Sequence, residues 1–185
     1  MAEGKTTHRV EGDTVLVLER VFDAPRALVF EMFKYPEHIK RFWGPRGWDV
    51  PVCTVDFTPG GTWHYCMKCV DEKMGDYYGM EAWGKAVYRE IDEPTRLAYT
   101  DYFCDADGTV NPDLPVTEVV MEFLDLGGKT KLVSRSTYAS AEALGTVMDM
   151  GMLQGIAETW DRLEERLAEG LAHRPRGRVR PVSDL

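Results

Sequence analysis

Two groups of side chains in the sequence have types and spacings that could do chemistry. The first is Cys66 and Cys69, whose Cys-x-x-Cys spacing is the one that zinc and redox sites use. They lie in an expected strand, where residues three apart point to opposite faces, so the two thiolates do not turn toward one metal. We therefore predict no metal site and reduced, structural cysteines, with Cys53 and Cys104 isolated from the pair. His64 and Cys66 share a strand face, which keeps a metal-binding alternative open.

The second group is an aspartate among tyrosines, on strands that we expect to face the interior. Desolvation there would raise the pKa of Asp101, so that it could act as a general acid or base beside Tyr65, Tyr99 or Tyr138. The alternative is an ordinary aspartate in solvent at the end of a strand. Asp101 is therefore the one candidate catalytic residue.

The common catalytic motifs are missing from the sequence. It has no phosphate-binding glycine loop with a lysine, no Gly-x-Ser-x-Gly elbow and no His-Glu-x-x-His pair. We therefore expect no cofactor, and a binding protein more than an enzyme, although the question of catalysis stays open.

A long amphipathic helix over residues 140–170 is expected to position these groups. Ser140 is the predicted N-cap and Gly170 the predicted stop. Gly151 and Gly155 lie inside it, which predicts that either a packed element or a ligand comes close to the backbone there. Glu164 is expected on the opposite, exposed face of the helix. The apolar stripe, at spacings of three and four, consists of Leu144, Met148, Met152, Ile156, Trp160, Leu163 and Leu167.

The segment before this helix is rich in strand signals separated by glycine and proline. Short connections favour hairpins and hence an antiparallel sheet in meander order. Two short helices are expected after the first strand, one beginning near Pro25 and one over residues 37–42. We therefore predict an α+β fold in which a curved antiparallel sheet of about seven strands wraps around the long C-terminal helix. The expected strands cover residues 13–22, 50–57, 61–70, 77–91, 96–103, 116–126 and 129–138.

Alternation along these strands predicts which side chains face the helix. Lys129, Lys131 and Arg135 mark the solvent face of the last strand, so its even-numbered residues face inward. The interior is then aromatic and methionine-rich but carries many hydroxyls, which is typical of a small-molecule cavity more than of a solid core. The predicted ligand-binding residues are Trp63, Tyr65, Met67, Tyr99, Met121, Ser134, Ser136, Tyr138, Met148, Met152 and Gly155.

Composition limits the classes of partner. The chain has 185 residues, 44% hydrophobic and 29% charged, which suits one domain with its own core. The net charge of −9 argues against nucleic acid or an anionic membrane as the main partner. No apolar run is long enough for membrane insertion and residues 1–13 lack the apolar centre of a secretion signal, so we expect a soluble, cytoplasmic protein, monomeric or homodimeric.

Four motifs in order resemble a known family. They are Leu-Glu-Arg-Val-Phe-Asp-Ala-Pro at 18–25, Arg-Phe-Trp-Gly-Pro at 41–45, Asp-Phe-Thr-Pro-Gly-Gly-Thr-Trp at 56–63, and Gly151-Met152 followed by Ile-Ala-Glu-Thr-Trp-Asp-Arg-Leu at 156–163. Together they are similar to homologues of the activator of the 90-kDa heat-shock protein's ATPase. The resemblance implies the helix-grip fold of the START-like (SRPBCC) superfamily, with a deep hydrophobic pocket between the sheet and the last helix.

The resemblance also implies the candidate functions. Its superfamily contains lipid-transfer domains and polyketide cyclases, so the first expectation is binding of a lipid-like or polycyclic aromatic molecule. The alternatives are stimulation of a heat-shock protein ATPase, with a chaperone as partner and a role in stress response, or a cyclase-like enzyme. Fold alone does not decide among them.

Two segments fall outside the common pattern. Residues 105–115 form a longer connection than a tight hairpin needs, and it is expected to be either a lid over the pocket or a solvated loop. Residues 1–170 are expected to form the helix-grip domain, and residues 171–185 a basic flexible tail broken by proline and glycine.

Overall fold

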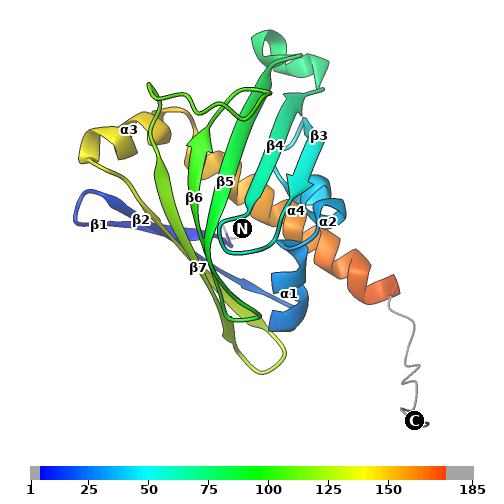
Figure 1. Ribbon diagram of the computed structural model, residues 1–185. Coiled ribbons are helices and arrows are strands. Elements are labelled where there is room, and N and C mark those ends of the chain that lie inside the picture. The colour runs from blue at the N-terminus through cyan, green and yellow to red at the C-terminus, as the bar shows by residue number, and fades with distance from the viewer. Residues whose placement is uncertain (1–4, 174–185) are drawn as a thin grey trace, which may run out of the picture.

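The alternating segments of the chain form one antiparallel sheet in the computed structural model, which describes residues 5–173 (Figure 1). The strands follow the spatial order β1-β2-β8-β7-β6-β5-β4-β3, so β3 to β8 are a meander and β2 closes on β8. The predicted fold class is therefore confirmed. The strands are β1 (Thr7–Glu11), β2 (Val15–Phe22), β3 (Trp48–Val55), β4 (Thr62–Cys69), β5 (Glu81–Asp92), β6 (Arg96–Phe103), β7 (Thr117–Asp125) and β8 (Thr130–Thr137).

The sheet has eight strands, one more than predicted. The additional strand, β1, is an edge strand whose residues lie mostly in solvent, so no inward apolar face marks it in the sequence. A tight turn joins it to β2, with positive φ at Gly12 (54°) and Asp13 (65°), as in the hairpin turns that match the twist of antiparallel strands. The strand predicted from residue 77 begins later, because Glu72–Tyr77 form a short 3₁₀ helix, η1, in the β4–β5 connection.

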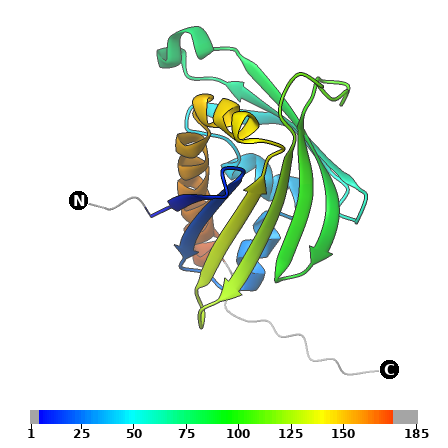
Figure 2. The ribbon, with the colours of Figure 1, turned by 90° about the vertical axis from the view of Figure 1, so that its left-hand side faces the viewer.

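The helices lie on the concave side of the sheet, which curves around them (Figure 2). Two short helices follow β2, as predicted: α1 (Arg26–Met32) and α2 (Pro36–Phe42). The C-terminal segment consists of α3 (Ala141–Asp149) and α4 (Met152–His173).

The prediction of one uninterrupted C-terminal helix is wrong. Gly151 has φ 82°, a left-handed conformation that ends α3, and α4 starts with the next residue. The sequence hides this break because the apolar spacing continues across it. Ser140 is the N-cap, since its Oγ accepts a hydrogen bond from the Ala143 N–H at 3.0 Å. Gly170 does not stop the helix, which continues to His173. The part of the expected tail from Arg174 onward lies outside the described residues.

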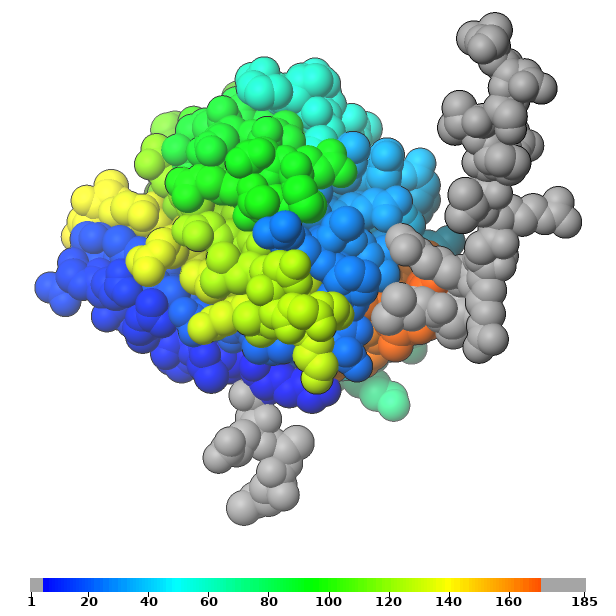
Figure 3. Space-filling model, turned by 90° about the horizontal axis from the view of Figure 1, so that it is seen from below, coloured from blue at the N-terminus to red at the C-terminus, as the bar shows by residue number. Residues whose placement is uncertain are grey.

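One end of the concave face is a solid apolar core, which we call the apolar inner face: Phe22, Phe30, Phe33, Phe123, Leu132 and Trp160. Its rings meet edge to face, with centroids 5.0 Å apart for Phe30 and Phe123 and 6.1 Å for Phe22 and Trp160. Figure 3 views this end of the molecule, where α1, the β7–β8 hairpin and the end of α4 lie against one another.

Two arginines fasten α4 to the rest of the domain. The buried guanidinium of Arg20 on β2 donates to Asp161 at 2.7 Å and to Glu164 at 3.0 Å. Glu164 is therefore half-buried and paired, and the expectation of a free surface residue is wrong. Arg162 donates to the carbonyl oxygens of Gly44 at 3.0 Å and Trp48 at 3.2 Å, which ties α4 to the α2–β3 loop.

None of the helices within residues 5–173 is both long enough and apolar enough to cross a membrane.

Candidate functional site

The predicted polar side chains gather on one part of the concave face. In the register of the sheet, Asp101 on β6 lies opposite Thr117 on β7, and Tyr99 lies opposite Val119. The next strand pair, β7 with β8, places Ser136 opposite Val119 and Ser134 opposite Met121. We call this set the polar inner face: Tyr65, Tyr99, Asp101, Ser134, Ser136 and Tyr138.

Solvent reaches the polar inner face and does not reach the centre of the apolar one. Tyr65 keeps 6% of its surface exposed and Ser136 keeps 8%, whereas Phe123 and Leu132 have 0%. Asp101 is half-buried. The difference matters because a side chain that keeps accessible surface inside a fold has room beside it for another atom.

The Asp101 carboxylate is held next to a tyrosine. The hydroxyl of Tyr65 donates to Asp101 Oδ1 at 3.5 Å. Burial raises the pKa of Asp101 to about 7, although hydrogen bonds from Tyr65 and from the Tyr102 backbone oppose the shift. Burial also raises the pKa of Tyr65 and Tyr99 well above 10, with the Asp101 charge as the next cause. The alternative of an ordinary solvated aspartate is therefore wrong.

Gly84 makes the position of Tyr65 possible. It lies directly opposite Tyr65 across the β4–β5 ladder, and a Cβ at residue 84 would collide with the Tyr65 ring and hydroxyl. Any other residue there would push the ring off the sheet. Sequence reasoning missed Gly84, because a strand glycine signals a close approach without saying what approaches.

Aromatic rings surround the Asp101–Tyr65 pair. Trp63 lies with its ring centroid 4.7 Å from that of Tyr65 and 6.1 Å from that of Tyr99. Trp43, at the C-cap of α2, completes the group at 4.6 Å from Trp63. Trp63 Nε1 and Tyr88 Oη are buried without a hydrogen-bond partner among the described residues. Trp43 and Tyr88 were not predicted as site residues.

The helical residues of the predicted site lie at the break between α3 and α4. Met148, Met152 and Gly155 are half-buried, in contrast to Trp160 and Leu163 farther along α4. A Cβ added at Gly155 or Gly151 would meet no atom within 4 Å, so the packed-element explanation of these glycines is wrong. The ligand explanation remains a prediction. Of the other predicted residues, Met121 is buried beneath the Tyr99 hydroxyl and Met67 is half-buried beside Gly44.

The four cysteines are free thiols. Burial raises the pKa of Cys53 to about 11 and also raises that of Cys66, so both stay protonated near neutral pH. The ring of His64 stacks on Trp83, with centroids 5.3 Å apart. Within the described residues, no three histidine, cysteine, aspartate or glutamate side chains are grouped so that they could hold a metal ion.

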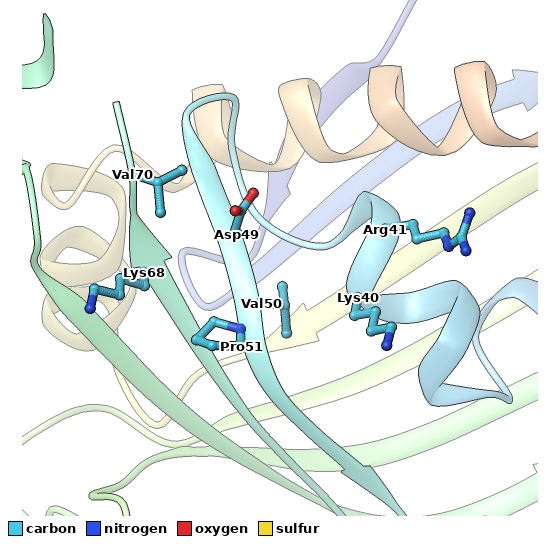
Figure 4. Close-up of a pocket in the computed structure, with 7 residues that line it drawn as sticks. All are labelled: Lys40, Arg41, Asp49, Val50, Pro51, Lys68 and Val70. Carbon is cyan, nitrogen blue, oxygen red and sulfur yellow. The ribbon is translucent and has the colours of Figure 1, made fainter. Parts of the chain in front are cut away.

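A separate hollow of about 350 Å³ lies at the edge of the sheet. It is lined by residues of β3, of α2 and of the end of β4 (Figure 4). Lys40, Arg41 and Lys68 supply positive charge around it, and Asp49 the only negative charge in its lining. Its lining comes from the edge of the sheet and from α2, and it includes none of the residues of the polar inner face. We therefore regard the polar inner face as the candidate functional site.

The comparisons with known proteins show the family and the fold. The family model "Activator of Hsp90 ATPase homolog 1-like protein" matches residues 23–168. The crystal structure of protein Ms6760 from Mycobacterium smegmatis is 31% identical, with a TM-score of 0.76, over 86% of this chain and 94% of that one. A solution structure from Arthrobacter aurescens is 26% identical, with a TM-score of 0.79, over 93% and 98% of the two chains. A search of curated proteins found no match.

Proposed function

The chain belongs to the family of activator of Hsp90 ATPase homolog 1-like proteins, and from that premise we propose that it binds a hydrophobic small molecule on the polar inner face. The ligand would be lipid-like or polycyclic and aromatic, and it would lie between the sheet and the α3–α4 break. Its apolar body would replace water against the rings and methionines, which is the usual source of affinity for such ligands.

The observation that supports the proposal best is the difference in exposure along the concave face. Solvent touches the buried tyrosines and serines at the α3 end, and the Gly155 side of α4 has open space. A domain that needed only a core would gain stability by filling this region, as it does around Phe123. Retained access to polar groups is typical of a binding site.

The side chains suit a ligand that is mostly apolar with one or two polar atoms. Met148 and Met152 are flexible and polarizable, so they can adapt to an irregular apolar surface. Ser134, Ser136 and Tyr138 offer hydroxyls that can donate to or accept from a carbonyl or hydroxyl of the ligand.

The direct test is to fill the space with a side chain. We expect the purified protein to bind N-phenyl-1-naphthylamine, a neutral apolar probe that becomes fluorescent in apolar surroundings, and to gain thermal stability from it. Stabilisation grows as RT ln(1 + [L]/Kd), about 2.7 kcal/mol at a hundredfold excess over Kd. Gly155→Leu should abolish the fluorescence increase and the thermal shift, because the new side chain occupies the open space beside α4.

The matched control is Ala168→Leu, which adds the same apolar side chain at an exposed position of α4. It should bind the probe as the unmodified protein does. Equal binding by all three proteins, with Gly155→Leu folded by circular dichroism, would place the probe elsewhere and contradict the proposed site.

A cyclase-like enzyme is the second candidate, and the environment of Asp101 favours it. A carboxyl group with a pKa of about 7 can exchange protons near neutral pH, as a general acid or base must. This candidate predicts that a bound polyketone is converted to a cyclised product, and that Asp101→Asn stops conversion without loss of binding. Stimulation of a heat-shock protein ATPase, the activity in the family's description, predicts instead an effect on that ATPase which Gly155→Leu leaves intact.

A further inference from the structure

Asp101 is a half-buried carboxylate whose protein partners are all neutral. Its side chain accepts from the Tyr65 hydroxyl at 3.5 Å and is stabilised by the Tyr102 backbone. Among residues 5–173, no lysine, arginine or histidine forms an ion pair with it. Most acidic residues that have lost this much contact with water are paired with a cation.

The charged and titratable groups nearby do not supply that cation. Tyr65, Tyr99 and Tyr138 face Asp101 from β4, β6 and the end of β8, and all three are neutral at physiological pH. Lys85 on β5 lies closer to Cys104 and donates to the Gly108 carbonyl oxygen, while Asp105 adds a further negative charge there. No charged side chain of α3 or of the described part of α4 is among the groups that shift Asp101.

Aromatic rings lie beside the carboxylate. Tyr65 contacts it through its hydroxyl, Tyr99 precedes it by two residues on the same strand face, and Trp63 contacts both rings. The faces of tyrosine and tryptophan rings attract cations within about 6 Å, and this attraction strengthens when water is excluded. An acidic group among such rings is the combination that recognises an ammonium group.

We propose that the polar inner face takes an amphipathic amine, whose protonated nitrogen binds the Asp101 carboxylate beside the rings of Tyr65 and Tyr99. The apolar body of the amine lies toward Met148 and Met152. This inference rests on the proposed function, because it names the ligand class of the same site, and it commits that site to a positive charge.

The test compares two probes of the same shape by isothermal titration calorimetry: 2-naphthylmethylamine, which is cationic, and 2-naphthylmethanol, which is neutral. An alkyl amine stays protonated near neutral pH, as lysine does, so only the protein titrates. Between about pH 6 and about pH 8 the Asp101 carboxyl, with its pKa of about 7, goes from mostly protonated to mostly ionised. The amine should therefore bind about tenfold more tightly at the higher pH, while the affinity of the alcohol changes by less than about twofold.

Three variants separate the role of the charge from the role of the fold. Asp101→Asn keeps the shape and should remove both the pH dependence and the preference for the amine. Asp107→Asn, which removes an exposed carboxylate from the neighbouring loop, should leave both unchanged. Tyr65→Phe removes the hydroxyl that lowers the pKa of Asp101, so the midpoint of the affinity curve should move to higher pH.

The outcomes are distinguishable. Equal affinities for amine and alcohol at every pH would overturn the inference and leave the proposed function standing. Failure of both naphthalene probes and of N-phenyl-1-naphthylamine to bind would overturn both. If Asp101→Asn does not fold, the Tyr65→Phe midpoint decides, and an unmoved midpoint counts against the inference.

Discussion

The two ends of α4 are held in different ways. Toward its C-terminus, Trp160, Leu163 and Leu167 are buried, and Arg162 and Asp161 tie it to the α2–β3 loop and to Arg20. Toward its N-terminus, Met152 and Gly155 are half-buried, and Gly151 separates α4 from α3. One end is therefore packed into the core, and the other is the end where we propose that a ligand binds.

The sheet beneath the helix shows the same division. The apolar inner face consists of Leu132 and of rings in edge-to-face contact, with no accessible surface at its centre. The polar inner face carries hydroxyls and a carboxyl group. Buried polar groups lower the free energy of unfolding unless they are satisfied, so we expect this end to contribute less to the stability of the core.

The largest effect on stability should come from the apolar inner face. Trp160→Ala should lower the free energy of unfolding by about 3–5 kcal/mol, because it opens a cavity beside Phe22 that the surrounding sheet cannot close. Gln154→Ala, at an exposed position nearer the start of α4, should change it by less than about 0.5 kcal/mol. Urea denaturation measures both, and similar midpoints would mean that the two ends of α4 do not differ as the packing indicates.

A smaller effect on stability, which depends on pH, should come from the polar inner face. The pKa of Asp101 in the folded protein is about 7, above the value of about 3.9 for a free aspartate, so the folded state binds the extra proton between these values. The ionised carboxylate therefore lowers stability above about pH 7, and this cost shrinks as the pH falls toward about 4.

Asp101→Asn removes this cost, since asparagine keeps the shape without the charge. It should raise the free energy of unfolding by about 1–3 kcal/mol at pH 8, and by less than about half as much at pH 5. Thermal denaturation of both proteins at the two pH values measures it. An equal gain in the free energy of unfolding at both pH values would show that Asp101 titrates normally. The two inner faces would then not differ in their electrostatics.

Alternation was enough to predict which residues of β8 face inward, and helical spacing was enough for Trp160 and Leu163. Leu132, Ser134, Ser136 and Tyr138 are buried as the charges on their neighbours required, because a strand has only two faces. The break at Gly151 could not be predicted in this way, since Met148 and Met152 keep helical spacing across it. The contact of Tyr65 with Asp101 depends on the register of three strands and on the missing side chain of Gly84, neither of which periodicity reports.

The smallest effect on stability should come from the N-terminal part of α4, beside the polar inner face. Glycine inside a helix costs conformational entropy on folding, and the Gly155 backbone is helical with no atom within 4 Å of an added Cβ. Gly155→Ala should therefore raise the free energy of unfolding by about 0.4–1 kcal/mol, because alanine restricts the unfolded chain and strains nothing in the folded one. Gly84→Ala is the contrasting variant, since its Cβ would collide with Tyr65 and should destabilise the domain. If both substitutions were destabilising in urea denaturation, the space beside Gly155 would be filled as tightly as the space beside Gly84. The polar inner face would then have no room for a ligand next to α4.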